Sequence, residues 1–214
     1  ARQMGLPWNY RRYVHMFVNG TKKGSSAQIM EDTERGGDDF VDARFPDDRD
    51  GNLYKMQPWF EVDDGTALQL GFVNQNWCTL NRYSPATNSA VHYTPRYRQN
   101  WLVRAANSTA NDFAPVYDLI DAAQTPTNGW AAHTAAMENV ANMEEWTRVF
   151  AVCHSVGDWD HFGTQNSQNM YSYKPERDKF HLMIWDFNIL LGNSGSWGPG
   201  QNLFVVTATD TRMP

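Results

Sequence analysis

The sequence of 214 residues has no long apolar run, few cysteines and no excess of positive charge. No apolar run approaches the ~20 residues of a membrane-spanning helix. Only two cysteines are present, Cys78 and Cys153, without a CxxC pair, which excludes a disulfide scaffold and a cysteine zinc site. Whether these two cysteines pair stays open. The net charge of −6 argues against sequence-independent binding of nucleic acid, which needs a basic surface.

Several catalytic motifs are also missing. There is no G-x-S-x-G and no HExxH, and the six histidines are scattered, so nucleophilic hydrolysis is poorly supported. A G-x-G-x-x-G loop is absent, which leaves the Asn19-Gly20 turn with Gly24 as the only candidate phosphate cover. The acidic stretch 47–52 does not match an EF-hand and predicts a solvated loop. Because the chain begins at Ala1 without a Met, we expect a fragment of a longer chain.

The first half of the chain predicts strands, and its apolar content of 41% overall is enough for a packed core. The clearest signal is Asn19-Gly20, which favours a hairpin because both turn positions need a positive φ. The segment 35–52 is rich in Gly and Asp and predicts a loop. The expected strands are 13–18, a return strand at 26–31, 52–55, 59–62 and 67–73.

The second half predicts helices. Apolar residues recur at helical spacing over 113–123, with Pro115 in the first turn, where its missing N–H costs nothing. Residues 131–140 are Ala-rich, and Asn142 with Glu145 three residues later resembles a capping box at the start of a further helix.

Together these patterns predict an α+β protein of two lobes. The strand-rich part covers about 1–100 and the helical part about 105–214. The join is expected between Tyr93 and Asn111, where the chain is polar and irregular.

Three polar residues near the C-terminus carry the strongest functional signal: Asp160, Asn169 and Asp186. They surround a predicted hairpin with strands at 169–173 and 180–185. Protein kinases use the same order, with a catalytic Asp, then a metal-binding Asn, then a metal-binding Asp at the end of the second strand. Such oxygen ligands suit Mg²⁺. Each residue alone also fits a turn, because Asp and Asn side chains bond nearby backbone groups.

Lys55 is a candidate for contacting phosphate, and Glu31 is a candidate for holding Lys55 in place. In a kinase, a strand lysine neutralises the α- and β-phosphates and a Glu holds it in place. Lys55 follows a Gly51-Asn52 turn in a predicted strand, but from the residues alone it fits an ordinary surface lysine better. Glu31 is interpreted as the partner of Lys55, as a metal ligand or as an exposed carboxylate at a strand end.

The motifs together resemble the CotH-like family, which is named for a bacterial spore-coat protein and is related to atypical protein kinases. The resemblance covers nearly the whole chain. A departure is Asn188, because the family usually has a second Asp at that position. The most specific blocks are Gly157-Asp158-Trp159-Asp160, Asn169-Met170-Tyr171-Ser172-Tyr173 and Ile184-Trp185-Asp186-Phe187.

The resemblance implies a single domain over 1–214 with a divergent protein-kinase-like two-lobe fold. It implies ATP and Mg²⁺ as cofactors and phosphoryl transfer to Ser or Thr of a protein substrate. By the same resemblance Asp160, rather than Asp158, is the catalytic carboxylate. The resemblance also implies that Lys55 contacts the phosphates and that Glu31 holds Lys55 in place. Asn169 and Asp186 are implied to bind the metal, and Phe180 to contact the adenine or to pack in the core.

Two alternatives remain open on the same fold. One is a non-catalytic surface or coat module that uses its nine Trp and nine Tyr residues for assembly. The other is a pseudokinase that binds nucleotide with Mg²⁺ but transfers no phosphate. Analogy with the family favours an exported or cell-surface bacterial protein.

Overall fold

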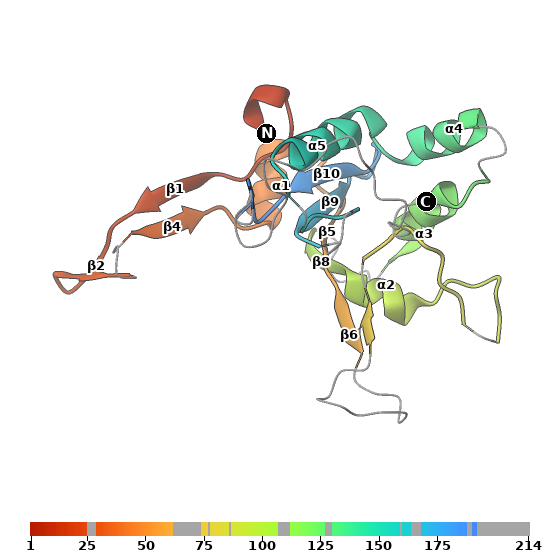
Figure 1. The fold of residues 1–214 in the computed structure, drawn as a ribbon, viewed down its shortest axis with the longest axis horizontal. Helices are drawn as coiled ribbons and strands as arrows, with labels where there is room; N and C mark the ends of the chain where they lie inside the picture. The colour runs from red at the N-terminus through yellow and green to blue at the C-terminus, as the bar shows by residue number, and fades with distance from the viewer. Residues whose placement is uncertain are drawn as a thin grey trace.

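The elements of the chain are five α-helices, a 3-10 helix and ten strands within the residues that the structure, a computed structural model, describes (Figure 1). Those residues are 1–24, 29–61, 74–76, 78–85, 87–106, 112–126, 130–158, 160–163, 168–187 and 190–191. The strands are β1 (Arg11–Val14), β2 (Met16–Val18), β3 (Thr21–Lys23), β4 (Met30–Thr33), β5 (Asn52–Met56), β6 (Trp59–Glu61), β7 (Asn74–Asn76), β8 (Trp101–Ala106), β9 (Met170–Lys174) and β10 (His181–Ile184). The helices are η1 (Arg2–Met4), α1 (Asp38–Arg44), α2 (Thr94–Asn100), α3 (Ala114–Ala123), α4 (Trp130–Val140) and α5 (Met143–Ser155).

The central sheet has four antiparallel strands in the order β10-β9-β5-β8. Its register aligns Lys55 of β5 with Tyr171 of β9 on one side and with Leu102 of β8 on the other. The hairpin predicted near the C-terminus is confirmed as β9 and β10, with Met170 opposite Ile184. The sheet therefore joins strands from both halves of the sequence, and the expected division into two kinase-like lobes stays a prediction.

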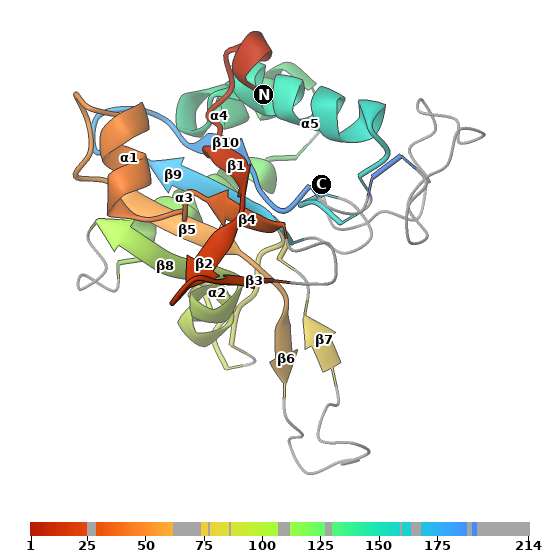
Figure 2. The same cartoon turned by 90° about the vertical axis from the view of Figure 1, so that its left-hand side faces the viewer.

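Both faces of this sheet are covered by apolar side chains. On one face, Tyr54 and Leu182 belong to the large core that includes residues of α3 and α5. On the other face, Leu53 and Tyr173 pack against α1, which lies beside the sheet in Figure 2. The strands of the sheet are thus held from both sides, and β9 is buried from Met170 to Tyr173.

The first four strands form a separate structure, which we call the N-terminal arm (β1 to β4). Strand β1 pairs with β4 and β2 with β3, and the arm projects away from the central sheet (Figure 1). Asn19 and Gly20 have φ values of 50° and 76°, which confirms the predicted turn. The turn leads directly into β3, which pairs with β2, because a two-residue turn pairs the residues that flank it. The predicted return strand 26–31 is confirmed at its described end, where Met30 and Glu31 of β4 pair with Val14 and Tyr13 of β1.

Two segments expected to be irregular contain regular elements. The predicted loop at 35–52 contains α1, because Phe40 and Val41 are buried and Asp38 and Asp39 occupy the first turn, where negative charge favours a helix. The expected join at 93–111 contains α2 and β8. The predicted strand at 67–73 lies outside the described residues.

The predicted helices of the second half are confirmed as α3, α4 and α5. The side chain of Asn142 caps α5 by accepting a hydrogen bond of 3.2 Å from the N–H of Glu145. Glu145 itself is 5% exposed and binds strand β10: its Oε1 accepts from the N–H of Leu182 and its Oε2 lies 3.0 Å from Nδ1 of His181. Helix α5 is therefore fixed to the hairpin at its first turn.

The fold class is mixed α/β with antiparallel sheets, as predicted at the level of an α+β protein. No helix in the part of the chain that the structure describes has the length and hydropathy of a membrane span. Cys78 and Cys153 are both buried free thiols.

Candidate functional site

The two ends of the β9–β10 hairpin carry Asn169 and Asp186. Asn169 directly precedes Met170, Asp186 follows Ile184 by two residues, and Met170 and Ile184 are cross-strand partners. The register therefore brings both polar residues to one end of the hairpin, as predicted. Both have a positive φ, 54° and 59°, a conformation that residues with a side chain adopt uncommonly and that is often found at functional sites.

Asp160 lies beside Asn169 in the loop that follows α5. It is 5% exposed, and its Oδ2 accepts a hydrogen bond of 2.5 Å from the amide nitrogen of Asn169. Its Oδ1 accepts a second hydrogen bond, 2.8 Å long, from Gln168. Because the contact uses the amide nitrogen of Asn169, the amide oxygen remains as the atom that suits a metal ion.

Asp158 holds the backbone of this loop by a hydrogen bond. Its Oδ1 accepts from the N–H of Asp160 at 3.0 Å, and it is 2% exposed. Burial raises the pKa of Asp158 to about 6, and although the hydrogen bond from Asp160 opposes this shift, the negative charges of Asp160 and Asp186 add to it. The three carboxylates thus interact electrostatically, which is the condition under which a divalent cation stabilises them.

Lys55 lies on the face of the sheet that α1 covers, within electrostatic range of Asp186. Burial lowers the pKa of Lys55, the charge of Arg104 lowers it further, and the charge of Asp186 raises it in part. Asp186 is therefore the residue that interacts both with the lysine and with the carboxylates of the loop.

Arg104 is a site residue that the sequence did not predict. The pairing of β5 with β8 passes from Tyr54–Val103 to Leu53–Ala105, so Arg104 is the extra residue of a β-bulge. Bulges redirect side chains and are common beside active sites. The Nε of Arg104 is buried and has no hydrogen-bond partner within the described part of the chain. Burial raises the pKa of the Tyr171 hydroxyl, and the charge of Arg104 and a hydrogen bond with it oppose this shift in part.

The remaining two predicted site residues, Glu31 and Phe180, have partners of their own. Glu31 is exposed on β4 of the arm and forms an ion pair of 3.2 Å with Arg11. Phe180 is 1% exposed, and its ring packs in the core against Tyr54 and Trp101, which is the core-packing alternative. Asn188 lies outside the described residues.

A cavity of about 210 Å³ adjoins Asp186. Its wall combines aromatic rings with the guanidinium group of Arg11, which lies 5.6 Å from the ring centroid of Trp185. The lining residues are Ala1, Trp8, Asn9, Arg11, Ile184, Trp185, Asp186 and Phe187.

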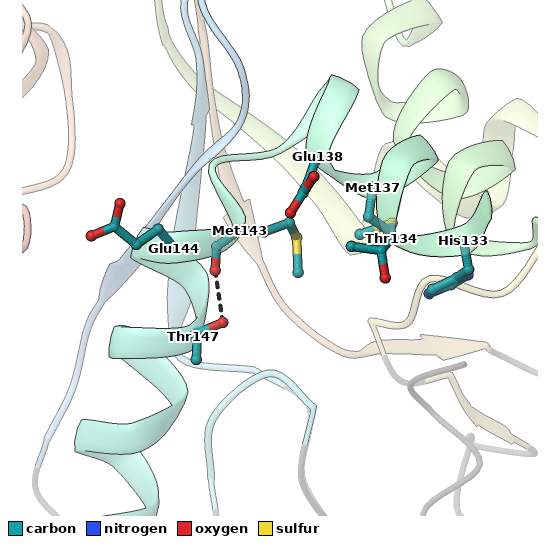
Figure 3. Close-up of a pocket in the computed structure, with 7 residues that line it drawn as sticks. All are labelled: His133, Thr134, Met137, Glu138, Met143, Glu144 and Thr147. Atoms are coloured by element: carbon teal, nitrogen blue, oxygen red, sulfur yellow. Dashed lines mark hydrogen bonds between the residues drawn. The ribbon is translucent and has the colours of Figure 1, made fainter. Parts of the chain in front are cut away.

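A larger hollow of about 390 Å³ lies between α4 and α5, and none of its lining residues is a predicted site residue (Figure 3). There Thr147 of α5 donates a hydrogen bond to the carbonyl oxygen of Met143 within the same helix, 2.7 Å long. The hollow is therefore a surface feature of the two helices rather than part of the site.

A second group of chemically reactive side chains lies at the end of α5 and in the loop that carries Asp160. Cys153, Asp158 and His161 are all buried, and one potential ligand atom from each lies within 4.8 Å of the others. The sequence had not predicted this group, although the spacing Cys-x4-Asp-x2-His is visible in it.

The part of the chain that the structure describes is a mixed α/β domain in which Asp160 is hydrogen-bonded to Asn169 at one end of the β9–β10 hairpin, the end that also carries Asp186. A comparison with protein-family models matches residues 1–209 to a family described as CotH kinase protein. The chain therefore belongs to the CotH kinase family, which confirms the assignment made from its motifs. No curated protein and no solved structure matches the chain.

Proposed function

We propose that the protein is a CotH-type kinase that transfers the γ-phosphoryl group of ATP, bound with Mg²⁺, to Ser or Thr of a protein substrate. Lys55 and Arg104 would contact the phosphates, Asp186 and Asn169 would hold the metal, and Asp160 would orient the acceptor hydroxyl. Membership of the kinase family supports the reaction class.

The observation that supports this proposal is that Lys55, on the central sheet, interacts electrostatically both with a second cation, Arg104, and with Asp186. The positive charge of Arg104 lowers the pKa of Lys55, so the two side chains repel each other. A triphosphate would remove this repulsion and would give the buried Nε of Arg104 an acceptor. Two cations that repel each other favour the binding of a polyanion.

The carboxylates fit a magnesium ion by their chemistry. Asp186 and Asn169 present oxygen ligands, Asp160 lies beside Asn169, and the negative charges of Asp160 and Asp186 contribute to the raised pKa of Asp158. When bound, Mg²⁺ would neutralise charge on the phosphates. Asn169 and Gln168 hold the Asp160 carboxylate with two hydrogen bonds, so its orientation is set before substrate arrives.

In the transfer step, the acceptor hydroxyl oxygen forms a bond to the γ-phosphorus while the bond from that phosphorus to the ADP oxygen breaks. Asp160 accepts the hydroxyl proton, and Lys55 and Arg104 stabilise the negative charge on the phosphate oxygens. The protein contributes mainly positioning and electrostatic stabilisation, as in other phosphoryl transfers.

Binding is tested by calorimetric titration with ATP in the presence of Mg²⁺. We expect Asp186→Ala to abolish metal-dependent binding, and Lys55→Ala to weaken it about 10- to 100-fold, the effect of losing a charged hydrogen bond. Matched controls are Asp32→Ala and Lys23→Ala, which remove exposed charges from the arm and should leave affinity unchanged. Unchanged affinity in Asp186→Ala would contradict the assignment.

Catalysis is tested separately from binding. Asp160→Asn should retain binding of Mg²⁺ and ATP but lose transfer of labelled phosphate to a Ser-rich acceptor protein. If the wild type binds ATP but transfers no phosphate to any acceptor, the pseudokinase alternative replaces the kinase.

A second candidate function is an assembly module, and the N-terminal arm favours it. Tyr13 is 81% exposed and Phe17 is 61% exposed, which is unusual for large apolar side chains on adjacent strands. A thermal-shift assay separates the candidates, since a ligand that binds only the folded state raises the melting temperature. A shift that requires both ATP and Mg²⁺ supports the kinase, and no shift under any condition supports the assembly module.

A further inference from the structure

The group of Cys153, Asp158 and His161 has the composition of a transition-metal site. Cys153 belongs to the last turns of α5, and Asp158 and His161 lie in the loop that follows, so all three come from nine consecutive residues. Their exposed fractions are 0%, 2% and 1%. Thiolate and imidazole are ligands for zinc and its neighbours in the periodic table, whereas magnesium prefers oxygen alone.

The separation of the three side chains suits a single ion. Ligand atoms that share one zinc ion at about 2.0–2.3 Å lie less than about 4.6 Å apart. The candidate atoms of this group lie within 4.8 Å of one another, so only small side-chain adjustments are needed. Three protein ligands leave one tetrahedral position for a water molecule or for His154, whose ring centroid lies 5.7 Å from that of His161.

Neighbouring contacts already hold two of the ligands in place. Nδ1 of His161 lies 2.6 Å from the backbone carbonyl oxygen of Asp158, the kind of contact that orients metal-bound histidines. Oδ1 of Asp158 accepts the N–H of Asp160 at 3.0 Å, and Oδ2 of Asp158 lies 3.8 Å from Nδ1 of His161. One carboxylate oxygen therefore faces the group while the other fixes the backbone of Asp160.

The same residue types form catalytic triads in hydrolases, but this group is unsuited to that chemistry. Burial raises the pKa of the Cys153 thiol, and the charge of Asp158 raises it further, so the thiol stays protonated in the absence of a metal. A nucleophile also needs access to substrate, and Cys153 has none at 0% exposure.

We propose that Cys153, Asp158 and His161 bind one Zn²⁺ ion, which fixes the loop carrying Asp160 to the end of α5. The proposed zinc site differs from the magnesium site proposed above in its ligands, because it includes a sulfur and an imidazole nitrogen and uses neither Asn169 nor Asp186. On binding, the thiol of Cys153 loses its proton to solvent and its sulfur becomes a ligand.

The chain offers a matched control for this proposal, because Cys78 is its only other cysteine and is also buried at 0% exposure. The experiment uses the protein freed of any affinity tag and titrated with Co²⁺, which replaces zinc and absorbs light when a thiolate binds it. We expect the thiolate–cobalt absorption band in the wild type and in Cys78→Ser, and its loss in Cys153→Ser. Addition of Zn²⁺ should abolish the band by displacing cobalt, whereas Mg²⁺ should not.

Absence of the band from both the wild type and Cys78→Ser overturns the proposal, as does its persistence in Cys153→Ser. If Cys153→Ser does not fold, Cys78→Ser still tests the proposal, because Cys153 is the only cysteine left in that variant. In a competition assay with a chelator, His161→Gln in the Cys78→Ser background should weaken zinc binding at least about tenfold. Unchanged zinc affinity in that variant removes His161 from the site and overturns the proposal.

Discussion

The N-terminal arm and the β9–β10 hairpin are both antiparallel pairs, but they differ in what covers them. All three residues of β2 are exposed, whereas β9 is buried from Met170 to Tyr173 and lies between two neighbouring strands. A buried hairpin can hold Asn169 and Asp186 in fixed positions, and an exposed arm cannot do this for Glu31. The comparison teaches that turn residues specify a hairpin, while burial on both faces makes it a scaffold for a site.

The largest expected difference between the two regions comes from removing apolar side chains. Leu182 of β10 is 0% exposed, so Leu182→Ala should lower the free energy of unfolding by about 2–5 kcal/mol through lost contacts and the cavity left behind. Phe17→Ala in the arm should change it by less than about 0.5 kcal/mol, because Phe17 is 61% exposed. Urea unfolding curves of the two variants measure this difference, and equal losses would contradict the distinction.

A second difference is expected at glycines. A Cβ at Gly51 would lie 2.1 Å from the carbonyl oxygen of Lys174 and 2.6 Å from Cα of Pro175, so the backbone of the sheet must move. Gly51→Ala should therefore destabilise the protein by about 1–3 kcal/mol.

The matched variant is Gly20→Ala at the tip of the arm. Gly20 has a φ of 76°, but nothing lies within 4 Å of a Cβ built there. Its strain should stay local to the arm, so the midpoint of thermal unfolding should remain that of the wild type. A larger fall in that midpoint for Gly20→Ala than for Gly51→Ala would show that the arm belongs to the cooperative core.

The smallest expected effect concerns pH and the link between α5 and β10. Burial by itself lowers the pKa of His181, but the hydrogen bond and charge of Glu145, together with the charge of Asp178, outweigh it and raise the pKa above 6.5. A raised pKa means that the folded state binds the proton more tightly than the unfolded state. The stabilisation is therefore complete below about pH 6.5 and is lost as the pH rises through the higher folded value.

Glu145→Gln should reduce this pH dependence while keeping an acceptor for the N–H of Leu182, at a cost of about 1 kcal/mol at pH 6. Arg12→Gln is the control in the arm, since it breaks the exposed ion pair with Asp32 and should leave the pH profile unchanged. Melting temperatures measured from pH 6 to pH 8 test both, and an unaltered slope in Glu145→Gln would show that His181 is not the group that titrates.

Sequence patterns predicted the parts of the fold that depend on local chemistry. The Asn19-Gly20 turn, the Asn142 cap and the hairpin ends at Asn169 and Asp186 each follow from a turn or cap whose geometry requires those residues. Helix α1 was missed because its Gly- and Asp-rich sequence is typical of a loop, and only the burial of Phe40 and Val41 makes it a helix.

Arg104, the cation that interacts with Lys55, could not be predicted from the sequence for a different reason. Arg104 is the extra residue of a bulge in the pairing of β5 with β8, and a bulge depends on two strands that are distant in sequence. The group of Cys153, Asp158 and His161 was visible as a spacing, but its burial and convergence required the fold.

The most direct test of the account is the affinity for ATP with Mg²⁺ of Arg104 variants, because no sequence motif assigned that residue. We expect Arg104→Gln to weaken binding about 10- to 100-fold in calorimetry and Arg104→Lys to weaken it less, since lysine keeps the positive charge but loses the guanidinium donors. Arg98→Gln, which changes an exposed arginine on α2, should bind as the wild type does. Equal affinities for the wild type and Arg104→Gln would contradict the proposal that the cations beside Asp186 form a phosphate site.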